Sequence, residues 1–339
     1  MNQMPHQQLA KLDQWSLMSV TGADAIDFLQ NQLTNSVKSL PLMKPDEFAA
    51  QDQARFAGYC SPKGRLMASF WMSRHQVEDA NGSTVPQIRL FVSSDLIANM
   101  AKRLSMYVLR SKAKVADLSA TTVCFGYCCD ETVSASNSQE LLSELQRISG
   151  AHLLELPPVA LVAGSTSYKR YLMSLPSEHE AKIYELSERY EVKGTAEYWN
   201  WLEVISAIPR ITSKTYEQFV PQMINMESLK GVDFQKGCYP GQEIVARSQY
   251  RGTIKRRLQL AQTQHSALPN MGTEIFHSAD PTQPCGMVVL AACDPLDTNK
   301  IDLQVECKLE AFETGTVHLG EATGPVLRFQ ALPYPLIEI

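Results

Sequence analysis

The segment 231–257, GVDFQKGCYPGQEIVARSQYRGTIKRR, holds the densest group of chemically active side chains in the sequence. Pro240 and Gly241 are a natural central pair for a type II turn, because proline fixes φ and glycine accepts a positive φ. Such a turn is expected to hold a thiol, a phenol, an amide and a carboxylate close together. These groups belong to Cys238, Tyr239, Gln242 and Glu243.

Three interpretations of this loop stay open from residue types alone. A nucleophilic cysteine needs a general base, and no histidine stands near Cys238 in the sequence. The thiol could instead ligate a shared iron–sulfur cluster or react with a partner, and Lys236 would lower its pKa if the ammonium lay near the sulfur. The third interpretation is a structural turn with an incidental cysteine, and the residue types favour it.

A strip of basic residues follows the loop. Five cations fall within eleven residues with no acid between them: Arg247, Arg251, Lys255, Arg256 and Arg257. The whole chain of 339 residues has 36 acidic and 31 basic side chains, a net charge of −5. Most charge runs are solvated faces, but this one is a candidate docking site for a polyglutamate tail, a phosphate backbone or an acidic protein.

Most of the other seven cysteines are expected to be free, buried thiols. The cluster CFGYCC (124–129) is the best candidate for a metal site, but no second Cys or His pair stands at zinc-finger spacing. We therefore expect a buried strand at 124–129 and no metal.

Strand and helix patterns alternate before the loop. Residues 12–20 alternate as a strand does, and a helix is expected after Thr21, with Asp24 as its capping-box partner. The apolar stripe of this helix would consist of Ile26, Leu29, Leu33, Val37 and Leu40. A second helix is expected after Ser94, with Ile97, Met100 and Leu104 in its stripe.

Further elements are expected along the middle of the chain. Strands are predicted near 121–129 and near 159–164 or 170–174, and a helix near 139–149. The loose alternation of strands and helices favours an α/β or α+β architecture.

A helix over 196–207 carries two of the four tryptophans. Its core stripe is Tyr198, Trp201, Leu202 and Ile205, at spacing i, i+3, i+4, i+7. Trp199 lies about 100° from Tyr198 around the helix, which places it at or beyond the edge of the buried face. An exposed tryptophan invites a functional hypothesis, whereas packing of Trp199 against a neighbouring domain is an equally weighted alternative.

Beyond residue 250 the helical periodicity ends. Short β-rich segments separated by turn residues predict an all-β domain, either a small barrel or a sandwich. No apolar run approaches the roughly 18 residues that a membrane span requires. The N-terminus lacks the apolar segment of a signal peptide, so we expect a cytoplasmic protein.

The segment KGCYPGQEIVAR (236–247) resembles the KGCYxGQE signature of the YgfZ-type folate-binding proteins, which are relatives of the glycine-cleavage T-protein. The resemblance covers most of the chain. Its other segments are VTGADAIDFLQNQLTNSV (20–37), YCSPKGR (59–65), RLSMYVLRSKAKV (103–115), FVPQMINMESLKGVDF (219–234), RGTIKRR (251–257) and ALPYPL (331–336).

The resemblance implies an α+β fold. Two interwoven α/β subdomains of ferredoxin-like type would surround a central folate pocket within 1–248, and a β-barrel would occupy 249–339. It also implies binding of tetrahydrofolate or a one-carbon derivative by two tryptophans, which fall on Trp15 and Trp199. Cys238 becomes the functional thiol, while Lys236, Tyr239, Gln242 and Glu243 are further candidates for folate contact.

The role implied by the resemblance is that of an accessory protein. It would support assembly or repair of iron–sulfur enzymes, and through them tRNA modification, with those enzymes or cluster-assembly proteins as partners. One departure separates the chain from the T-protein, which carries a catalytic aspartate where this chain has Leu66-Met67-Ala68-Ser69. Aminomethyl transfer needs a group that manages protons there, so we expect no glycine-cleavage aminomethyltransferase activity.

Two alternatives remain from the sequence. The first is a folate-dependent one-carbon transferase with an unknown acceptor. The second is a direct RNA-binding module that uses the cations from Arg247 to Arg257, and the acidic net charge ranks it last.

Overall fold

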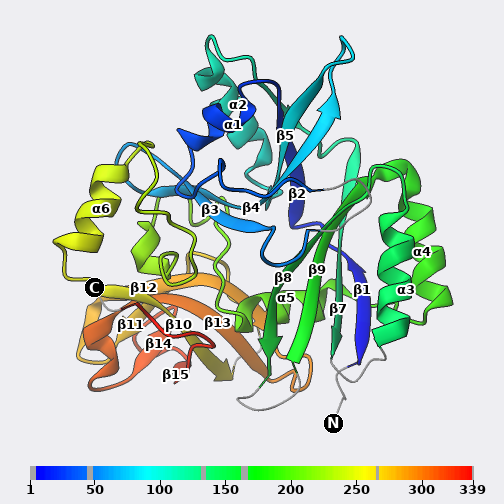
Figure 1. The fold of residues 1–339 in the computed structure, drawn as a ribbon. Coiled ribbons are helices and arrows are strands. Elements are labelled where there is room, and N and C mark those ends of the chain that lie inside the picture. Colours follow the sequence, from blue (N-terminus) through cyan, green and yellow to red (C-terminus); the bar gives the residue numbers. More distant parts are fainter. Residues whose placement is uncertain (1–4, 44–48, 131–134, 162–166, 265–266, 338–339) are drawn as a thin grey trace.

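The computed structural model describes residues 5–43, 49–130, 135–161, 167–264 and 267–337. Three groups of strands organise these residues: a five-stranded sheet, a four-stranded sheet and a closed barrel (Figure 1). We call the first two the N-terminal sheet and the middle sheet. This arrangement confirms the predicted α+β class.

The N-terminal sheet has the strand order β3-β4-β5-β2-β6, and all its pairs are antiparallel. Its strands are β2 (Trp15–Thr21), β3 (Arg55–Cys60), β4 (Leu66–Glu78), β5 (Thr84–Ser93) and β6 (Lys114–Asp117). Two helices accompany this sheet: α1 (Ala25–Gln30) and α2 (Ile97–Val108).

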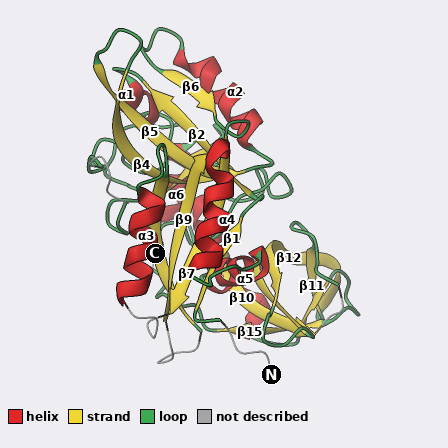
Figure 2. Cartoon of the chain, turned by 90° about the vertical axis from the view of Figure 1, so that its right-hand side faces the viewer, coloured by secondary structure: helices red, strands yellow, loops and turns green. Residues whose placement is uncertain are grey.

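The middle sheet has the order β1-β7-β9-β8. Its strands are β1 (Gln7–Lys11), β7 (Thr122–Asp130), β8 (His152–Ala160) and β9 (Ser167–Pro176). The helices α3 (Ala135–Gln146) and α4 (Glu180–Arg189) lie side by side over one of its faces (Figure 2). The chain begins in this sheet, leaves it to build the N-terminal sheet and returns at β7, so the two α/β units are interwoven as expected.

The third group is a closed barrel of six strands in the order β10-β13-β12-β11-β14-β15. Its strands are β10 (Arg256–Gln264), β11 (Glu274–His277), β12 (Asp280–Cys293), β13 (Lys300–Lys308), β14 (Val317–Leu319) and β15 (Val326–Gln330). Inward-facing Val288, Leu303 and Val305 are fully buried. The predicted small all-β barrel is confirmed. Because the barrel is closed, its sheet has no unpaired edge.

Helix α5 (Ala196–Ile205) contacts both the middle sheet and the barrel. The indole N–H of Trp201 donates to Asp302 Oδ2 of β13 at 2.7 Å, so Trp201 is a core residue as predicted. The side-chain amide of Gln304 donates to the backbone carbonyls of Glu203 and Val204 at 3.1 and 3.0 Å. These bonds attach the barrel to the C-terminal half of the helix.

The predicted first helix is too long. Helix α1 ends at Gln30, although Leu33, Val37 and Leu40 are buried as their spacing suggested. Gln30 Oε1 accepts the backbone N–H of Val37 at 2.7 Å, which satisfies a donor that a continued helix would have used. The capping prediction is also wrong, since Asp24 is the N-cap and its Oδ2 accepts the N–H of Lys112.

Of the other predicted elements, one strand and one helix are confirmed, and one strand is only partly covered by the described residues. The segment 124–129 is confirmed as part of the buried strand β7, and α2 begins at Ile97 with Ile97, Met100 and Leu104 buried. Residues 162–164 of one predicted strand lie outside the described residues, and β8 ends at Ala160.

The described residues contain no group of three or more His, Cys, Asp and Glu side chains that could hold a metal ion. In the same part of the chain, no helix has the length and apolar character to cross a membrane.

Candidate tryptophan pocket

A pocket lies where the N-terminal sheet, the middle sheet and the residues around the end of α5 meet. The space open to the centre of a water-sized sphere is only about 10 Å³, so the walls of the pocket lie close together. Its walls are formed by Trp15, Trp71, Leu156, Arg170, Trp199, Glu203, Ser206, Ile208, Pro209 and Arg210. Three of the four tryptophans of the chain therefore line one small space.

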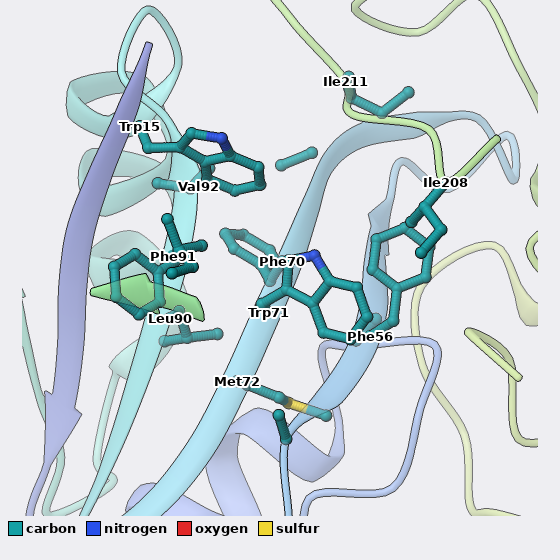
Figure 3. Packing of buried hydrophobic residues seen from close by; sticks show 14 of the residues in the cluster. Trp15, Phe56, Phe70, Trp71, Met72, Leu90, Phe91, Val92, Ile208 and Ile211 are labelled. Carbon is teal, nitrogen blue, oxygen red and sulfur yellow. The ribbon is translucent and has the colours of Figure 1, made fainter. Parts of the chain in front are cut away.

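Two of these indoles come from the N-terminal sheet. Trp15 begins β2 and Trp71 lies in β4, the two strands that flank β5 (Figure 3). Their residues are only 6% and 7% exposed. Trp71 packs against Phe56 with a ring-centroid distance of 5.1 Å, which fixes its position in the wall.

The third indole, Trp199, comes from α5 and is 2% exposed. It rests on Gly126 of β7, where an added Cβ would lie 2.3 Å from the indole atom Cε3. The prediction that Trp199 lies at the edge of the buried face is therefore wrong, and packing against a neighbouring sheet is the arrangement found. The reason is that α5 has two buried faces, one toward the middle sheet and one toward the barrel.

Two tryptophans that line the pocket have buried indole N–H groups without an acceptor among the described residues. The Nε1 atoms of Trp15 and Trp199 are buried, and no acceptor among the described residues takes a hydrogen bond from either. A buried donor left without an acceptor costs about 1–3 kcal/mol. Both residues would regain that free energy from a ligand that carries acceptors along the edge of a flat ring.

A buried arginine stands beside Trp199. The guanidinium of Arg170 donates through Nη2 to the backbone carbonyl of Pro157 at 3.0 Å, and its Cζ lies 6.0 Å from the Trp199 ring centroid. Burial lowers the pKa of Arg170 to about 10. The group still carries its proton at neutral pH, so it places a positive charge against the indole face.

A second arginine is held by an ion pair. Arg210 Nε donates to Glu203 Oε1 at 2.7 Å, and its Nη1 donates to Ser93 Oγ at 3.1 Å. Its Cζ lies 5.2 Å from the ring centroid of Trp15. Because Glu203 and Arg210 are both buried, removing either partner would leave an uncompensated charge, and the pair fixes this wall of the pocket.

A wider groove adjoins the pocket, since Trp71 lines both. It encloses about 1210 Å³, including open solvent. Its other lining residues are Ala50, Gln51, Asp52, Ala54, Arg55, Phe56, Glu155, Pro157, Leu229 and Lys230. The pocket is small and lined mainly by aromatic and apolar side chains, and the adjoining groove is much larger.

The signature loop, defined as Lys236–Glu243, runs into helix α6 (Gln242–Tyr250). Gly241 has φ 78°, the positive value that the turn prediction required. A Cβ on Gly241 would lie 2.4 Å from the carbonyl oxygen of Ser61 and 2.6 Å from the Cα of Gly64. Two turns that are far apart in the sequence, Ser61–Gly64 and Tyr239–Gln242, thus meet through glycine.

The four chemical groups of the loop do not gather in one site. Cys238 is exposed, whereas Tyr239 is buried and its burial raises the phenol pKa. Glu243 accepts from Arg247 at 2.8 Å on the surface, and the Gln242 amide donates to the Lys236 carbonyl at 3.4 Å. The turn therefore directs consecutive side chains to different surroundings.

Lys236 is engaged away from the role expected for it. Its Nζ donates to the backbone carbonyls of Gln30, Leu33 and Asn35, and lies 5.2 Å from the Tyr239 ring centroid. Burial lowers the Lys236 pKa to about 8. Lys236 thus holds the loop to the segment after α1. As far as the structure describes the chain, no residue from Lys236 to Glu243 lines the tryptophan pocket.

The predicted cationic strip is largely neutralised. Arg257 is 5% exposed and pairs with Glu227, and Arg256 Nη1 donates to both carboxylate oxygens of Glu306 at 3.0 and 2.9 Å. Within the described residues, only Arg251 and Lys255 of the strip lack an ion pair and are exposed. Acids distant in sequence fold against Arg256 and Arg257, so the strip is not a continuous run of unpaired cations, and polyanion docking there stays a prediction.

Sequence reasoning did not find four polar or aromatic residues of the pocket wall: Trp71, Arg170, Glu203 and Arg210. One signal was present for the last two. They are charges set within the apolar run NWLEVISAIPR (200–210), and charged side chains in such a run are seldom buried unless they are paired. No comparable signal marks Arg170, since its burial depends on sheet packing.

Comparisons with known proteins show what the chain is similar to. No family model matches the chain. The chain is 26% identical over 342 residues to the "tRNA-modifying protein YgfZ" of Yersinia enterocolitica, with 97% of this chain and 93% of that protein covered. It is 28% identical over 346 residues to the protein of that name from Sodalis glossinidius, with 97% and 94% covered.

A solved structure shows the same fold. The glycine cleavage system aminomethyltransferase T of Bartonella henselae matches 97% of this chain and 86% of its own length, with a TM-score of 0.65 and 12% identity. Sequence and fold together support the resemblance: the chain is similar to YgfZ proteins over 97% of its length and has the fold of glycine-cleavage aminomethyltransferase T.

Proposed function

We propose that this chain binds a reduced folate in the tryptophan pocket and that this binding supports the modification of tRNA. The observation that carries the proposal is the pocket itself, in which Trp15 and Trp199 present buried indole N–H groups without acceptors. The printed names of the relatives, and the fold shared with a folate-linked class of enzyme, point in the same direction.

The side chains that line the pocket have the chemistry to bind a pterin, and its closely packed walls would have to move apart to admit the ring. A flat pterin gains about 0.5–1.5 kcal/mol from each aromatic pair beyond its buried area. Its ring nitrogens and carbonyl are acceptors for indole N–H groups, and the Glu203–Arg210 pair adds charged hydrogen-bonding groups in the wall. When bound, the folate would supply a carrier for one-carbon units, as tetrahydrofolate or a one-carbon derivative.

We propose binding without glycine-cleavage aminomethyl transfer. Leu66, Met67, Ala68 and Ser69 begin β4 and are buried, and Ser69 Oγ accepts the N–H of Ile211 at 3.0 Å. These positions supply no carboxylate. The pocket carboxylate of Glu203 forms an ion pair with Arg210 at 2.7 Å.

The finer proposal is an accessory role toward iron–sulfur enzymes, in which Cys238 acts as the functional thiol. Its support is the exposure of Cys238 on a loop held in place by Lys236 and the two touching turns. An exposed thiol on a fixed loop can reach a partner protein. The neutralised arginines at 256 and 257 weaken the RNA-binding alternative.

Calorimetric titration with tetrahydrofolate tests the proposal. We expect saturable binding at one site, and at least about tenfold weaker binding for Trp15→Ala and for Trp199→Phe, because each loses an indole donor and stacking area worth about 1.4 kcal/mol together. Tyr250→Ala is the matched control, since Tyr250 is an aromatic residue 69% exposed outside the pocket.

Thermal unfolding must accompany each titration, so that loss of the fold is separated from loss of the ligand. Trp199→Phe keeps a ring against Gly126 and should retain the folded state. Wild-type affinity in both folded pocket variants would remove the assignment of the pocket.

A further inference from the structure

A surface on and after α2 combines exposed apolar side chains with unpaired cations. We define the α2 patch as Lys102, Met106, Tyr107, Leu109, Arg110, Lys112 and Lys114. Met106, Tyr107 and Leu109 are 67%, 45% and 86% exposed. Among the described residues, three of the ten exposed large hydrophobic side chains thus fall within four positions, although scattered single ones are the ordinary case.

The packing of α2 explains which side of it is free. Ile97, Met100 and Leu104 are buried against the N-terminal sheet. Helix α2 lies at the end of the molecule farthest from the barrel in both views (Figures 1 and 2). The α2 patch is therefore accessible from outside the molecule without any change in the fold.

The backbone of Leu109 has a strained conformation, and the Leu109 side chain is exposed. Leu109 has φ 47° and ψ −105°, and the N–H of Ser111 donates to the carbonyl of Val108 at 2.8 Å. This is the first central position of a type II′ turn, which glycine normally occupies. A leucine there is strained and exposed, so folding alone does not account for it.

The charges of the α2 patch are uncompensated. Residues 96–116 contain five basic side chains and no acid, in a chain whose net charge is −5. Lys102, Arg110, Lys112 and Lys114 are exposed, and none forms an ion pair with any residue that the structure describes. The nearby carboxylate of Asp24 accepts the backbone N–H of Lys112 rather than pairing with an ammonium.

We infer that the α2 patch is a docking surface for a protein partner whose own surface has an apolar recess rimmed by carboxylates. Protein interfaces have an apolar centre with a polar rim and are enriched in Met, Tyr and Arg, which is the arrangement found. Complementary carboxylates would pair with the four cations. A phosphate backbone would also attract the cations but would not bury Leu109 and Met106, so the observations favour a protein over RNA.

A photo-cross-linking experiment in cells identifies the partner. The full-length chain carries p-benzoyl-phenylalanine in place of Tyr107, with Tyr250 as the control position because it is an exposed tyrosine outside the patch. The proposal requires a protein cross-linked from position 107 and not from position 250. The absence of a cross-link from 107, or a cross-link to RNA, overturns it.

The purified partner is then titrated onto the wild type and onto two patch variants. Leu109→Gly should weaken binding at least tenfold while the Tm stays equal or rises, because glycine relieves the strained turn. The charge variant Lys102→Glu/Lys114→Glu should weaken binding tenfold or more, with an effect that diminishes as salt is raised.

Matched controls complete the test. Leu268→Ala removes an exposed leucine elsewhere, and Lys169→Glu/Lys214→Glu makes the same charge change on exposed residues outside the patch. Both should bind as the wild type does. The inference would be contradicted if Leu109→Gly bound the partner as tightly as the wild type does. It would also be contradicted if the wild type bound bulk tRNA and the patch variants did not. Its outcome is independent of folate binding.

Discussion

Gly126 decides where the indole of Trp199 can lie. The indole covers this residue so closely that three of its atoms would come within 2.7 Å of an added Cβ. The spacing of apolar residues along a helix identifies one buried face, whereas α5 has two. Spacing alone therefore could not predict that Trp199 is buried. The pairing of Trp15 with Trp199 came instead from the resemblance, while the structure adds Trp71 and the unpartnered N–H groups.

Replacing Gly126 with alanine should displace the Trp199 indole. We expect Gly126→Ala to destabilise the fold by about 1–3 kcal/mol through overpacking and to weaken tetrahydrofolate binding. Gly237→Ala is the matched control, since nothing lies within 4 Å of its added Cβ. Urea unfolding and calorimetry check both effects, and equal behaviour of the two variants would contradict the placement of Trp199.

Cys238 offers a second test at the scale of a single residue. Its side chain is exposed, so Cys238→Ala should change the free energy of unfolding by no more than about 0.5 kcal/mol. We expect this folded variant to fail to restore iron–sulfur enzyme activity in a cell that lacks the protein. Full restoration, measured beside a Cys293→Ala control that also removes an exposed thiol, would make Cys238 dispensable.

At the scale of elements, β4 and β8 are joined across the two sheets by a buried polar cluster. Ser73 Oγ lies 3.0 Å from His75 Nε2 and 3.1 Å from His152 Nε2, and the His152 ring stacks on Phe91 with centroids 5.4 Å apart. Burial lowers the His152 pKa well below its usual value and lowers the His75 pKa to about 3. Nearby Arg89 adds to both shifts.

The cluster predicts acid sensitivity of the fold. Below pH 6.5 these histidines bind protons in the unfolded chain but stay neutral in the folded chain. The stability that they contribute is therefore fully present above pH 6.5 and decreases as the pH falls below it. The slope is about 1.4 kcal/mol per pH unit for each histidine. Urea unfolding between pH 7.5 and 4.5 should show a smaller slope for His152→Gln than for the wild type. His179→Gln is the control and should keep the wild-type slope. An equal slope for His152→Gln and the wild type would contradict this account.

The elements also show what sequence patterns can and cannot predict. The barrel strands and β7 followed from β-rich segments bounded by turn residues. Helix α1 was overextended, because a stripe of Leu33, Val37 and Leu40 looks the same in a helix and in a buried segment held by the Gln30 side chain. The pairing of Arg256 and Arg257 with distant acids could not be predicted from local sequence.

At the scale of the whole molecule, the pocket exists because the chain is interwoven. Trp15 enters from the N-terminal sheet, Arg170 from the middle sheet, and Trp199 from a helix attached to the barrel through Trp201 and Gln304. Each wall thus belongs to a different layer of the fold. The signature loop and the α2 patch lie on other surfaces, which separates ligand binding from the sites that would meet partner proteins.

The most direct measurement of the central claim is a crystal structure of the chain in complex with 5-formyltetrahydrofolate, a stable reduced folate. The account predicts that the pterin ring lies against Trp15 and Trp199 and accepts a hydrogen bond from at least one of their indole N–H groups. A folate bound elsewhere, or a pocket that keeps both indole donors unpartnered at saturating ligand, would contradict it.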